Sequence, residues 1–526
     1  LKFFCSIEGN GSLSWDFGRA RRLDIQHQCL RRMSFLSRAC SAVLLTVGVS
    51  AFPVYDVDGG EPLAVNPSRG TAFSSVSKLD ASRLIECYSD YADGGAGICK
   101  ILSVDVDGMA VTEEGSVVFN ANHTQYINVA AFSSSAAVVC YLDHAGTDHL
   151  TCRYLDVGGS SIEPSEPYAV DDVAVEVSFL SVASLTHEVG IVCWSEPLNE
   201  VKDRAGVCNK LTLGQAGQIA VGSKTYFDQA FSTSDVTVQA FSETSAVVCW
   251  SAQGDGDCVA LSLSGSGSQD FAVGAIARFF SGDSEAFKGL VLVRFTAARG
   301  LVCWADKVAK NRVDCRALLV DGSALSYGEA GEVTAFPSLY LTADALTEDA
   351  ALVCYSADPD GSVIDSENFD GRGTCNVVGL VENGSAVGAG PPNEVNSGTT
   401  QHMAVASFDD RSAVLCYSDG GAGSGNCRAL GMAETTTSST TETSTSATSA
   451  TTVTTTPHTT TETTSLSGTS TTSWHTTTET LTTTSPHTTT GTNTAGAEGP
   501  QDSGSRAPDL LGACVALLAA ASVTLG

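Results

Sequence analysis

Hydrophobic and polar positions follow one pattern that recurs about every 55 residues through most of the chain. In the copy at residues 126–165, Tyr126–Phe132 alternates apolar with other residues, and the nearly continuous apolar run Ala136–Tyr141 follows a Ser-rich turn. Alternation predicts a half-buried strand, and a short apolar run predicts a strand buried on both faces. After a polar loop, Cys152–Val157 predicts a third strand and Ser161–Glu163 the start of a fourth. Each copy is therefore expected to be a four-stranded sheet.

Seven such copies predict an all-β fold, because signals for helices are scarce throughout the repeats. Four strands of about 5–6 residues with short connections come to about 50 residues, which is close to the period. Radial repetition of four-stranded sheets is typical of a β-propeller. We therefore predict a seven-bladed β-propeller over residues 52–433, and the alternative is an elongated array of β-sandwich or β-solenoid units.

The two ends of the repeat region predict how such a ring would close. The seventh copy ends after its third strand, where a Thr-rich segment begins. Val54–Val65 resembles the end of a repeat, as found at residues 103–111. The N-terminal segment is therefore expected to supply the missing fourth strand, a complement that a linear array does not need.

Cysteine placement predicts one disulfide within each copy. In every copy a Cys followed by Tyr or Trp precedes a second Cys 9 to 21 residues later. These pairs use 14 of the 18 cysteines, and the other four (Cys5, Cys29, Cys40, Cys514) fall in segments that we expect the mature protein to lack. Zinc is disfavoured because no CxxC spacing or recurring His accompanies the pairs. The predicted disulfides are Cys87–Cys99, Cys140–Cys152, Cys193–Cys208, Cys249–Cys258, Cys303–Cys315, Cys354–Cys375 and Cys416–Cys427.

The aromatic residue after the first cysteine is the most regular candidate for a ligand contact. A ring in every copy suits a sugar-stacking platform, but blade faces form the core of a propeller, so we expect these rings to pack between blades. They are Tyr88, Tyr141, Trp194, Trp250, Trp304, Tyr355 and Tyr417.

The N-terminal segment predicts entry into the secretory pathway. Met33–Arg38 is a short basic region, Cys40–Val49 is apolar, and Val49-Ser50-Ala51 is a small-residue cleavage site. Together they indicate a signal peptide at residues 33–51. Residues 1–32 are then expected to be a non-native upstream extension, and the alternative is a signal-anchor with a basic cytoplasmic arm.

The C-terminal segment predicts attachment to the cell surface. Residues 434–494 are almost all Thr and Ser and resemble an O-glycosylated, mucin-like stalk, with a bare flexible linker as the alternative. In residues 495–526, small residues and a polar spacer precede the uncharged run Leu510–Gly526, which is the order of a GPI-attachment signal. A short single-pass helix is the alternative.

Composition and motifs narrow the chemistry. The net charge of −31 argues against nucleic acid as a partner. No nucleophile, phosphate-loop or metalloprotease motif is present, so we assign no catalytic residue and no metal ligand. Asp358, Asp360, Asp365 and Glu367 leave calcium as a weak possibility. His144, Asp148 and His149 share one loop, but no other copy has them. Asn122 and Asn383 lie in N-glycosylation sequons.

The repeated Cys-aromatic pair resembles that of secreted RCC1-type propellers, which also carry Cys-Trp. The chain lacks their Gly-Gln-Leu-Gly signature, the Gly-Gly doublet of kelch and the Trp-Asp of WD40, so no functional residue is transferred. The signal, repeat head, Thr stalk and lipid tail are similar to the plan of GPI-anchored surface proteins. We therefore expect an extracellular, membrane-anchored protein that binds a glycan or protein ligand. The alternatives are a secreted propeller glycosidase or lyase and a structural coat or wall protein.

Overall fold

A computed structural model describes residues 6–7, 13–14, 55–67, 70–144, 149–171, 178–197, 204–229, 232–263, 271–282, 287–306, 311–358, 371–381, 384–420 and 423–434. These residues form β-strands and two short 3-10 helices, Tyr91–Asp93 and Gln215–Gly217. Strands β1 (Ser6–Ile7) and β2 (Leu13–Ser14) pair only with each other. Within the described ranges, no helix has the length and apolar character needed to cross a membrane.

The predicted four-stranded unit recurs along the chain, and in units 2 and 3 the fourth strand is split into two pieces that pair with the third. The strands of units 1 to 3 are β5 (Thr71–Lys78), β6 (Arg83–Asp90), β7 (Ala96–Asp105) and β8 (Ala110–Asn120); β9 (Thr124–Ser133), β10 (Ala136–Asp143), β11 (His149–Gly158), β12 (Ser161–Pro164) and β13 (Tyr168–Ala169); and β14 (Ser178–Ser184), β15 (Val189–Pro197), β16 (Arg204–Leu213), β17 (Ile219–Val221) and β18 (Thr225–Asp228).

Units 4 to 7 repeat this order, and the long strand β32 joins the last two of them. Its beginning pairs with β30 of unit 6, and its later part pairs with β33 of unit 7. The strands are β19 (Thr233–Ser242), β20 (Ser245–Ala252), β21 (Asp255–Leu263), β22 (Phe271–Val273) and β23 (Ala277–Phe280); β24 (Phe287–Arg294), β25 (Arg299–Asp306), β26 (Arg312–Asp321) and β27 (Ala324–Thr334); β28 (Ser338–Ala345), β29 (Ala350–Ala357), β30 (Arg372–Val381), β31 (Ala386–Ala389) and β32 (Asn393–Ser407); and β33 (Ser412–Asp419) and β34 (Ser424–Glu434).

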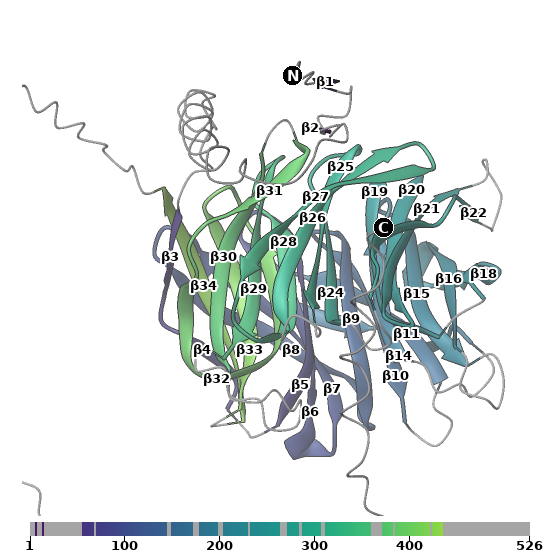
Figure 1. The fold of residues 1–526 in the computed structure, drawn as a ribbon. Coiled ribbons are helices and arrows are strands. Elements are labelled where there is room, and N and C mark those ends of the chain that lie inside the picture. The colour runs from purple at the N-terminus through teal and green to yellow at the C-terminus, as the bar shows by residue number, and fades with distance from the viewer. Residues whose placement is uncertain are drawn as a thin grey trace, which may run out of the picture. The chain divides into compact units, whose positions relative to one another are not determined.

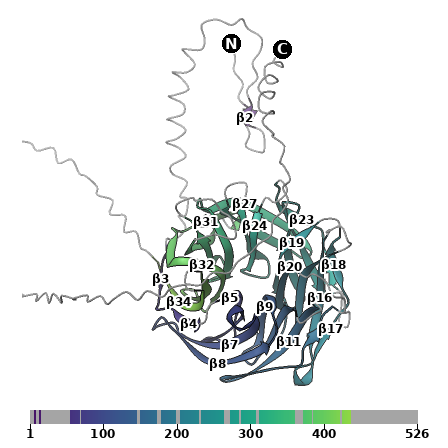
Figure 2. The same ribbon diagram turned by 90° about the horizontal axis from the view of Figure 1, so that it is seen from below.

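The outer strand of unit 7 comes from the opposite end of the repeat region, as the sequence predicts. β3 (Tyr55–Gly59) and β4 (Leu63–Asn66) both pair antiparallel with β34. The first strand of every unit contacts the first strand of the next, and β32 of unit 7 contacts β5 of unit 1. Figure 2 shows β5 and β9 toward the centre of the arrangement, with β8 and β17 toward its outside. These contacts are those that a closed ring of seven units requires, and a linear array has no such return contact.

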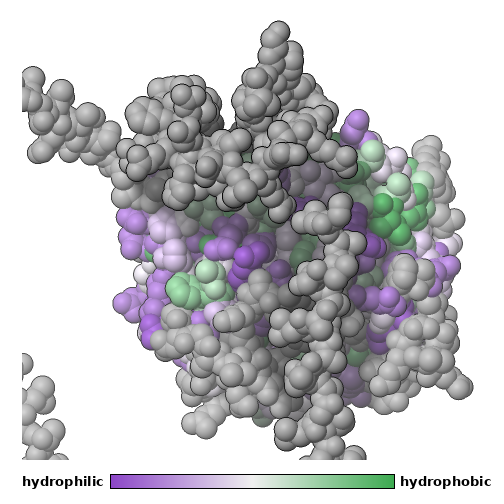
Figure 3. All heavy atoms as spheres, in the orientation of Figure 1, coloured by the Kyte–Doolittle hydropathy of each residue, from purple (hydrophilic) through white to green (hydrophobic). Residues whose placement is uncertain are grey.

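The hydrophobic core lies between units rather than within them. Seven clusters of buried residues each combine side chains of two successive units, and one cluster joins unit 7 to unit 1. The described surface visible in Figure 3 is largely hydrophilic, with smaller hydrophobic patches. The sheets stand side by side around the arrangement (Figure 1). Apolar second strands are therefore covered on both faces, which explains their unbroken apolar runs.

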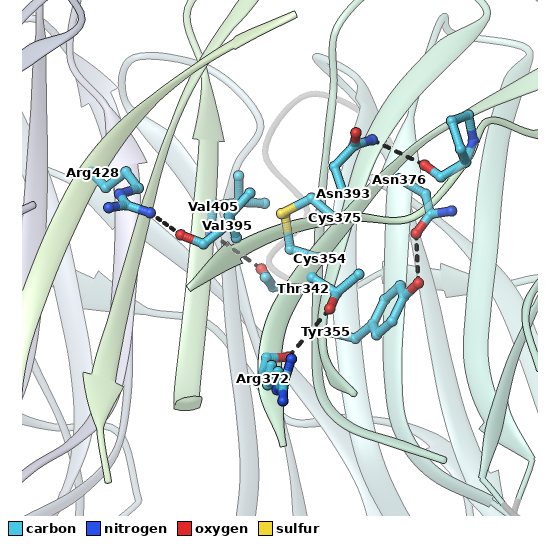
Figure 4. The surroundings of a disulfide bond; sticks show 12 residues. Thr342, Cys354, Tyr355, Arg372, Cys375, Asn376, Asn393, Val395, Val405 and Arg428 are labelled. Atoms are coloured by element: carbon cyan, nitrogen blue, oxygen red, sulfur yellow. Dashed lines mark hydrogen bonds between the residues drawn. A yellow bond between two sulfur atoms is a disulfide. The ribbon is translucent and has the colours of Figure 1, made fainter. Parts of the chain in front are cut away.

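All seven predicted disulfides are present. In each unit the two cysteines are direct partners on the second and third strands, with Cα atoms 4.0–4.1 Å apart. Figure 4 shows the bond between Cys354 and Cys375 in unit 6, where the Tyr355 hydroxyl donates to Asn376 Oδ1 at 2.5 Å. Seven cross-strand disulfides indicate a secreted or extracellular protein, because cytosolic thiols are kept reduced.

The seven aromatic residues that follow the first cysteines are core residues, as predicted. Each is at most 3% exposed. Three of them contact, at a tilted angle, a Phe from the outer strand of the preceding unit, such as Tyr141 and Phe119 with ring centroids 5.0 Å apart. A Cβ at Gly97 would lie 2.4 Å from the Phe119 ring, so glycine makes room for this contact.

Candidate functional site

The first strand of every unit is interrupted by a β-bulge near its beginning. The pairing register with the second strand shifts at the same place in all seven units. The residue within each bulge has a left-handed backbone conformation, and each lies fourteen positions before the first cysteine of its unit. These residues are Phe73 (φ 53°), Tyr126 (49°), Phe179 (54°), Asp235 (48°), Gly289 (71°), Tyr340 (52°) and His402 (47°).

This conformation is unfavourable for most of the side chains that occupy it. Left-handed φ values suit glycine and, to a lesser degree, Asn or Asp, and they cost about 1–2 kcal/mol for other residues. Gly289 and Asp235 therefore fit the position, whereas four aromatic residues and a histidine do not. Strained backbone positions of this kind cluster at active sites and ligand-binding sites, where the surrounding structure holds them in place. The bulges are therefore the first indication of a site.

The five rings form a contiguous arc, here called the collar: Phe73, Tyr126, Phe179, Tyr340 and His402. It runs through units 6, 7, 1, 2 and 3, and each ring contacts the next. The centroid distances and interplanar angles are 5.2 Å and 53° for Tyr340–His402, 5.6 Å and 47° for His402–Phe73, 5.3 Å and 49° for Phe73–Tyr126, and 6.2 Å and 50° for Tyr126–Phe179.

These angles show how the collar rings stand. Successive members of a seven-membered ring are rotated by about 51° about the central axis. Equivalent rings lying flat across the mouth would be parallel, whereas rings standing along the axis would be inclined by the full rotation. The observed 47–53° matches the second case. The collar rings therefore stand upright around the axis, and the contact between His402 and Phe73 bridges the last unit and the first.

The collar surrounds an apolar bowl with a volume of about 260 Å³. Between the rings it is lined by Ile127, Leu180, Leu341, Met403 and the Ser74 side chain, which donates a hydrogen bond to Glu86 Oε1 at 3.1 Å. The collar rings are half-buried. Burial lowers the pKa of His402 to about 4, so its imidazole is neutral at ordinary pH.

Beneath the bowl, the first strands enclose a polar channel of about 490 Å³. These strands are edge strands, and side chains of one unit satisfy N–H groups of the next. Ser75 Oγ accepts from the Val129 N–H at 3.0 Å, and Asn128 Oδ1 accepts from the Val182 N–H at 2.9 Å. Thr342 Oγ1 accepts from the Val405 N–H at 3.2 Å (Figure 4). The channel wall is thus bonded from unit to unit and holds the bulges in position.

Strand register places the ends of the second strands, which lead into the loops between paired cysteines, on the same face as the collar. Asp90, at the end of the second strand of unit 1, pairs with Thr71 at the beginning of the first, and Asp419 pairs with Thr400 in unit 7 in the same way. The longest of these loops, between Cys354 and Cys375, lies mostly outside the described residues. The described strand ends on either side of these loops therefore border the collar mouth.

The other sequence-based candidates have different outcomes. Asn122 is exposed in the connection between β8 and β9, so its glycosylation stays a prediction, and Asn383 lies outside the described residues. Of the acidic residues considered for calcium, only Asp358 is described. His144 Nε2 hydrogen-bonds Gln125 Oε1 at 2.9 Å and its ring stacks on His123, while Asp148 lies outside the described residues.

One buried cluster of three residues has the spacing of a metal site but lacks the thiolate ligands that such a site would need. Glu86, Cys416 and Cys427 place their ligand atoms within 4.8 Å of one another. Both cysteines belong to one disulfide, so neither supplies a thiolate. Burial raises the pKa of Glu86 to about 8. This cluster is a feature of the contact between units 7 and 1.

Sequence reasoning missed the collar, although a signal was present. The notable aromatic residues were those after the cysteines, which form the core. Counting backwards from each first cysteine to the fourteenth preceding residue finds an aromatic residue or His in five of the seven units. That spacing, and not the Cys-aromatic pair, marks the residues at the mouth.

The sheets, the disulfides and the collar define an all-β, propeller-like extracellular protein. No family model matches the chain, and no curated protein matches it. Similar solved structures include a prolyl endopeptidase (11% identity, TM-score 0.38, covering 79% of this chain). This chain spans about half the length of that endopeptidase, 54%. A second is a periplasmic gluconolactonase of Pseudomonas aeruginosa, with 14% identity and a TM-score of 0.42, where the match covers 62% of this chain and 86% of that one. A third is the NanB sialidase of Streptococcus pneumoniae, with 8% identity and a TM-score of 0.38, where the match covers 73% of this chain and 71% of that one. The TM-scores of these three structures are too low to support an inference about function.

Proposed function

We propose that this chain is an extracellular recognition protein, displayed at the cell surface, that binds a glycan or protein ligand at the collar. The observation that carries the proposal is the presence of five large rings at backbone positions where glycine would relieve strain. The upright rings and the bowl of about 260 Å³ supply a concave site that differs from unit to unit. The N-terminal signal, the Thr/Ser stalk and the C-terminal attachment signal are part of the same proposal.

Binding is favoured over glycoside hydrolysis by the composition of the bowl. Most glycosidases need two carboxyl groups on either side of the scissile bond. The described residues that line the bowl include no Asp or Glu, and neutral His402 is packed between Tyr340 and Phe73. The bowl is therefore suited to hold a group rather than to exchange protons with it.

The test is a glycan and protein array probed with the full chain, expressed in a secreting eukaryotic host and purified in detergent. We expect saturable binding without turnover, which is lost when Phe73 and Tyr340 are replaced by Gly, the residue that unit 5 has at this position. Tyr168→Gly, at an exposed ring that does not line the bowl, serves as the control. Unchanged binding by the collar variant would show that the collar is not the site, and turnover of a bound glycan would establish an enzyme.

A further inference from the structure

The chemistry of the bowl restricts the group that it can hold. Its described lining has no Lys, Arg, Asp or Glu, and the Ser74 hydroxyl is already engaged with Glu86. The remaining polar side-chain groups of the lining residues are two Tyr hydroxyls and the His402 ring. A sugar that left water for this bowl would find few partners for its hydroxyl groups, and each unpaired polar group costs free energy. The ligand group that is buried in the bowl should therefore be one that needs no hydrogen bonds.

The electrostatic surroundings of the bowl are negative. Asp235 lies at the collar position of unit 4, at the same level as the rings. In five of the seven units the second strand carries an acidic residue three positions after its first cysteine, at the end that faces the mouth: Asp90, Asp143, Glu196, Asp306 and Asp419. Of these, Glu196 forms an ion pair with Lys224 Nζ at 2.7 Å. The whole chain carries a net charge of −31. Such a mouth attracts cations and repels anions.

Among the described residues that line the bowl, no Lys or Arg counters this field. His402 is the one of these residues that can become positive, and its burial between Tyr340 and Phe73 keeps the ring neutral. The remaining collar residues are Phe or Tyr rings, whose π-systems attract cations at short range. The bowl is also smaller than the 300–1,000 Å³ that is typical of sites for whole drug-sized ligands, so a head group fits it better than an extended molecule.

We propose that the collar binds a quaternary ammonium head group, of the kind carried by choline or by a trimethylated lysine. This inference rests on the proposed function, since it assumes that the collar is the binding site. A methylated ammonium is a cation that needs no hydrogen bonds, and recognition of this group by aromatic residues is an established use of cation–π attraction. The same head group can decorate a glycan or a protein, so both ligand classes expected from the sequence can present it.

The experiment is a calorimetric titration of the full chain with three probes. Choline and a trimethyllysine peptide distinguish a free head group from one on a polypeptide. The third probe, 3,3-dimethylbutan-1-ol, has the shape of choline without its charge. We expect at least one ammonium probe to bind, and the neutral probe to bind at least tenfold more weakly. Replacement of Phe73 or Tyr340 by Leu, which keeps the apolar volume but removes the π-system, should weaken ammonium binding by roughly 3- to 30-fold. Tyr168→Leu is the matched control.

The outcomes separate this inference from the proposed function. Equal binding of choline and its neutral isostere would show an apolar site and overturn the ammonium inference alone. Ammonium binding that is unaffected by both Leu variants would place the cation elsewhere and also overturn it. Absence of ammonium binding, with array binding that still depends on the collar, would overturn the inference and leave the proposed function standing. Absence of both would overturn both.

Discussion

Glu86 makes the stability of the protein depend on pH in an unusual direction. This side chain is 1% exposed, between units 7 and 1, and the equivalent residue in every other unit is Val or Leu. Its Oε1 accepts from the Ser74 hydroxyl at 3.1 Å, and its Oε2 lies 3.2 Å from Sγ of Cys427. A disulfide sulfur has no proton to donate, so only a protonated Oε2 can make a hydrogen bond there. Burial accordingly raises the pKa of this carboxyl from 4.5 to about 8.

The sign and size of the effect follow from proton linkage. Between pH 4.5 and about 8 the folded protein keeps a proton that the unfolded chain releases, so the free energy of unfolding falls as pH rises. The free energy of unfolding falls by about 1.4 kcal/mol per pH unit. Across the window from pH 4.5 to 8 it falls by roughly 5 kcal/mol in total. The Lys100 and Glu113 side chains form an ion pair at 2.7 Å and act on Glu86 in opposite directions. The contribution of this group to stability should therefore be complete below pH 4.5, fall between pH 4.5 and 8, and level off above pH 8.

The assay is urea unfolding of the full chain with intact disulfides, followed by tryptophan fluorescence at pH 5, 6, 7, 8 and 9. Glu86→Gln keeps the size and removes the titration, so its stability should vary less between pH 5 and 8 than that of the natural chain. Glu86→Val matches the other units and should be more stable than the natural chain at pH 8. The same pH dependence of stability in the natural chain and the Gln variant would show that Glu86 does not titrate in this range.

Three further predictions test other parts of the description. The Trp250 indole donates to Asp228 Oδ2 at 3.0 Å, whereas the buried Trp304 Nε1 finds no hydrogen-bond partner among the described residues. Trp250→Phe should therefore destabilise the protein by about 1–3 kcal/mol more than Trp304→Phe in urea unfolding, and equal losses would contradict this. Replacing Cys303 and Cys315 together by Ala should cost about 3 kcal/mol, because their bond closes a loop of 12 residues, and an unchanged thermal midpoint would argue against it. Ammonium binding should weaken as the pH falls toward 4, because protonated His402 repels a cation, and titration should show a smaller change in His402→Gln.

The repeat, the strands, the disulfides and the buried aromatic residues were all predictable from the sequence because each follows from a local pattern. Alternating residues place Tyr126–Phe132 in a strand, and a Cys on each of two adjacent strands defines a cross-strand bond. The complement that β3 and β4 supply to unit 7 was predictable because a unit that lacks one strand must find it elsewhere in the chain. Every copy repeats the same information, so an error in one copy is corrected by the other six.

The collar was not predictable in the same way, because a β-bulge breaks the period on which strand prediction depends. At a left-handed position the sequence favours Gly or Asp, and only Gly289 and Asp235 agree with that preference. Phe73, Tyr126 and Tyr340 lie instead within stretches that strand propensity explains without a bulge. Glu86 was hidden for another reason: a single carboxylate in an apolar run is read as exposed until the contact between units 7 and 1 shows that it is buried.

The contrast between the two sets of aromatic residues locates the function on this scaffold. The rings after the cysteines occur in all seven units because every contact between units needs one, and each is almost fully buried. The collar rings occur in five units, are half-buried, and occupy a backbone conformation that disfavours them. A scaffold requirement would act equally on every unit and would favour glycine at the bulge. The collar is unequal around the ring and strained, so its side chains are better explained by what enters the mouth than by what holds the sheets together.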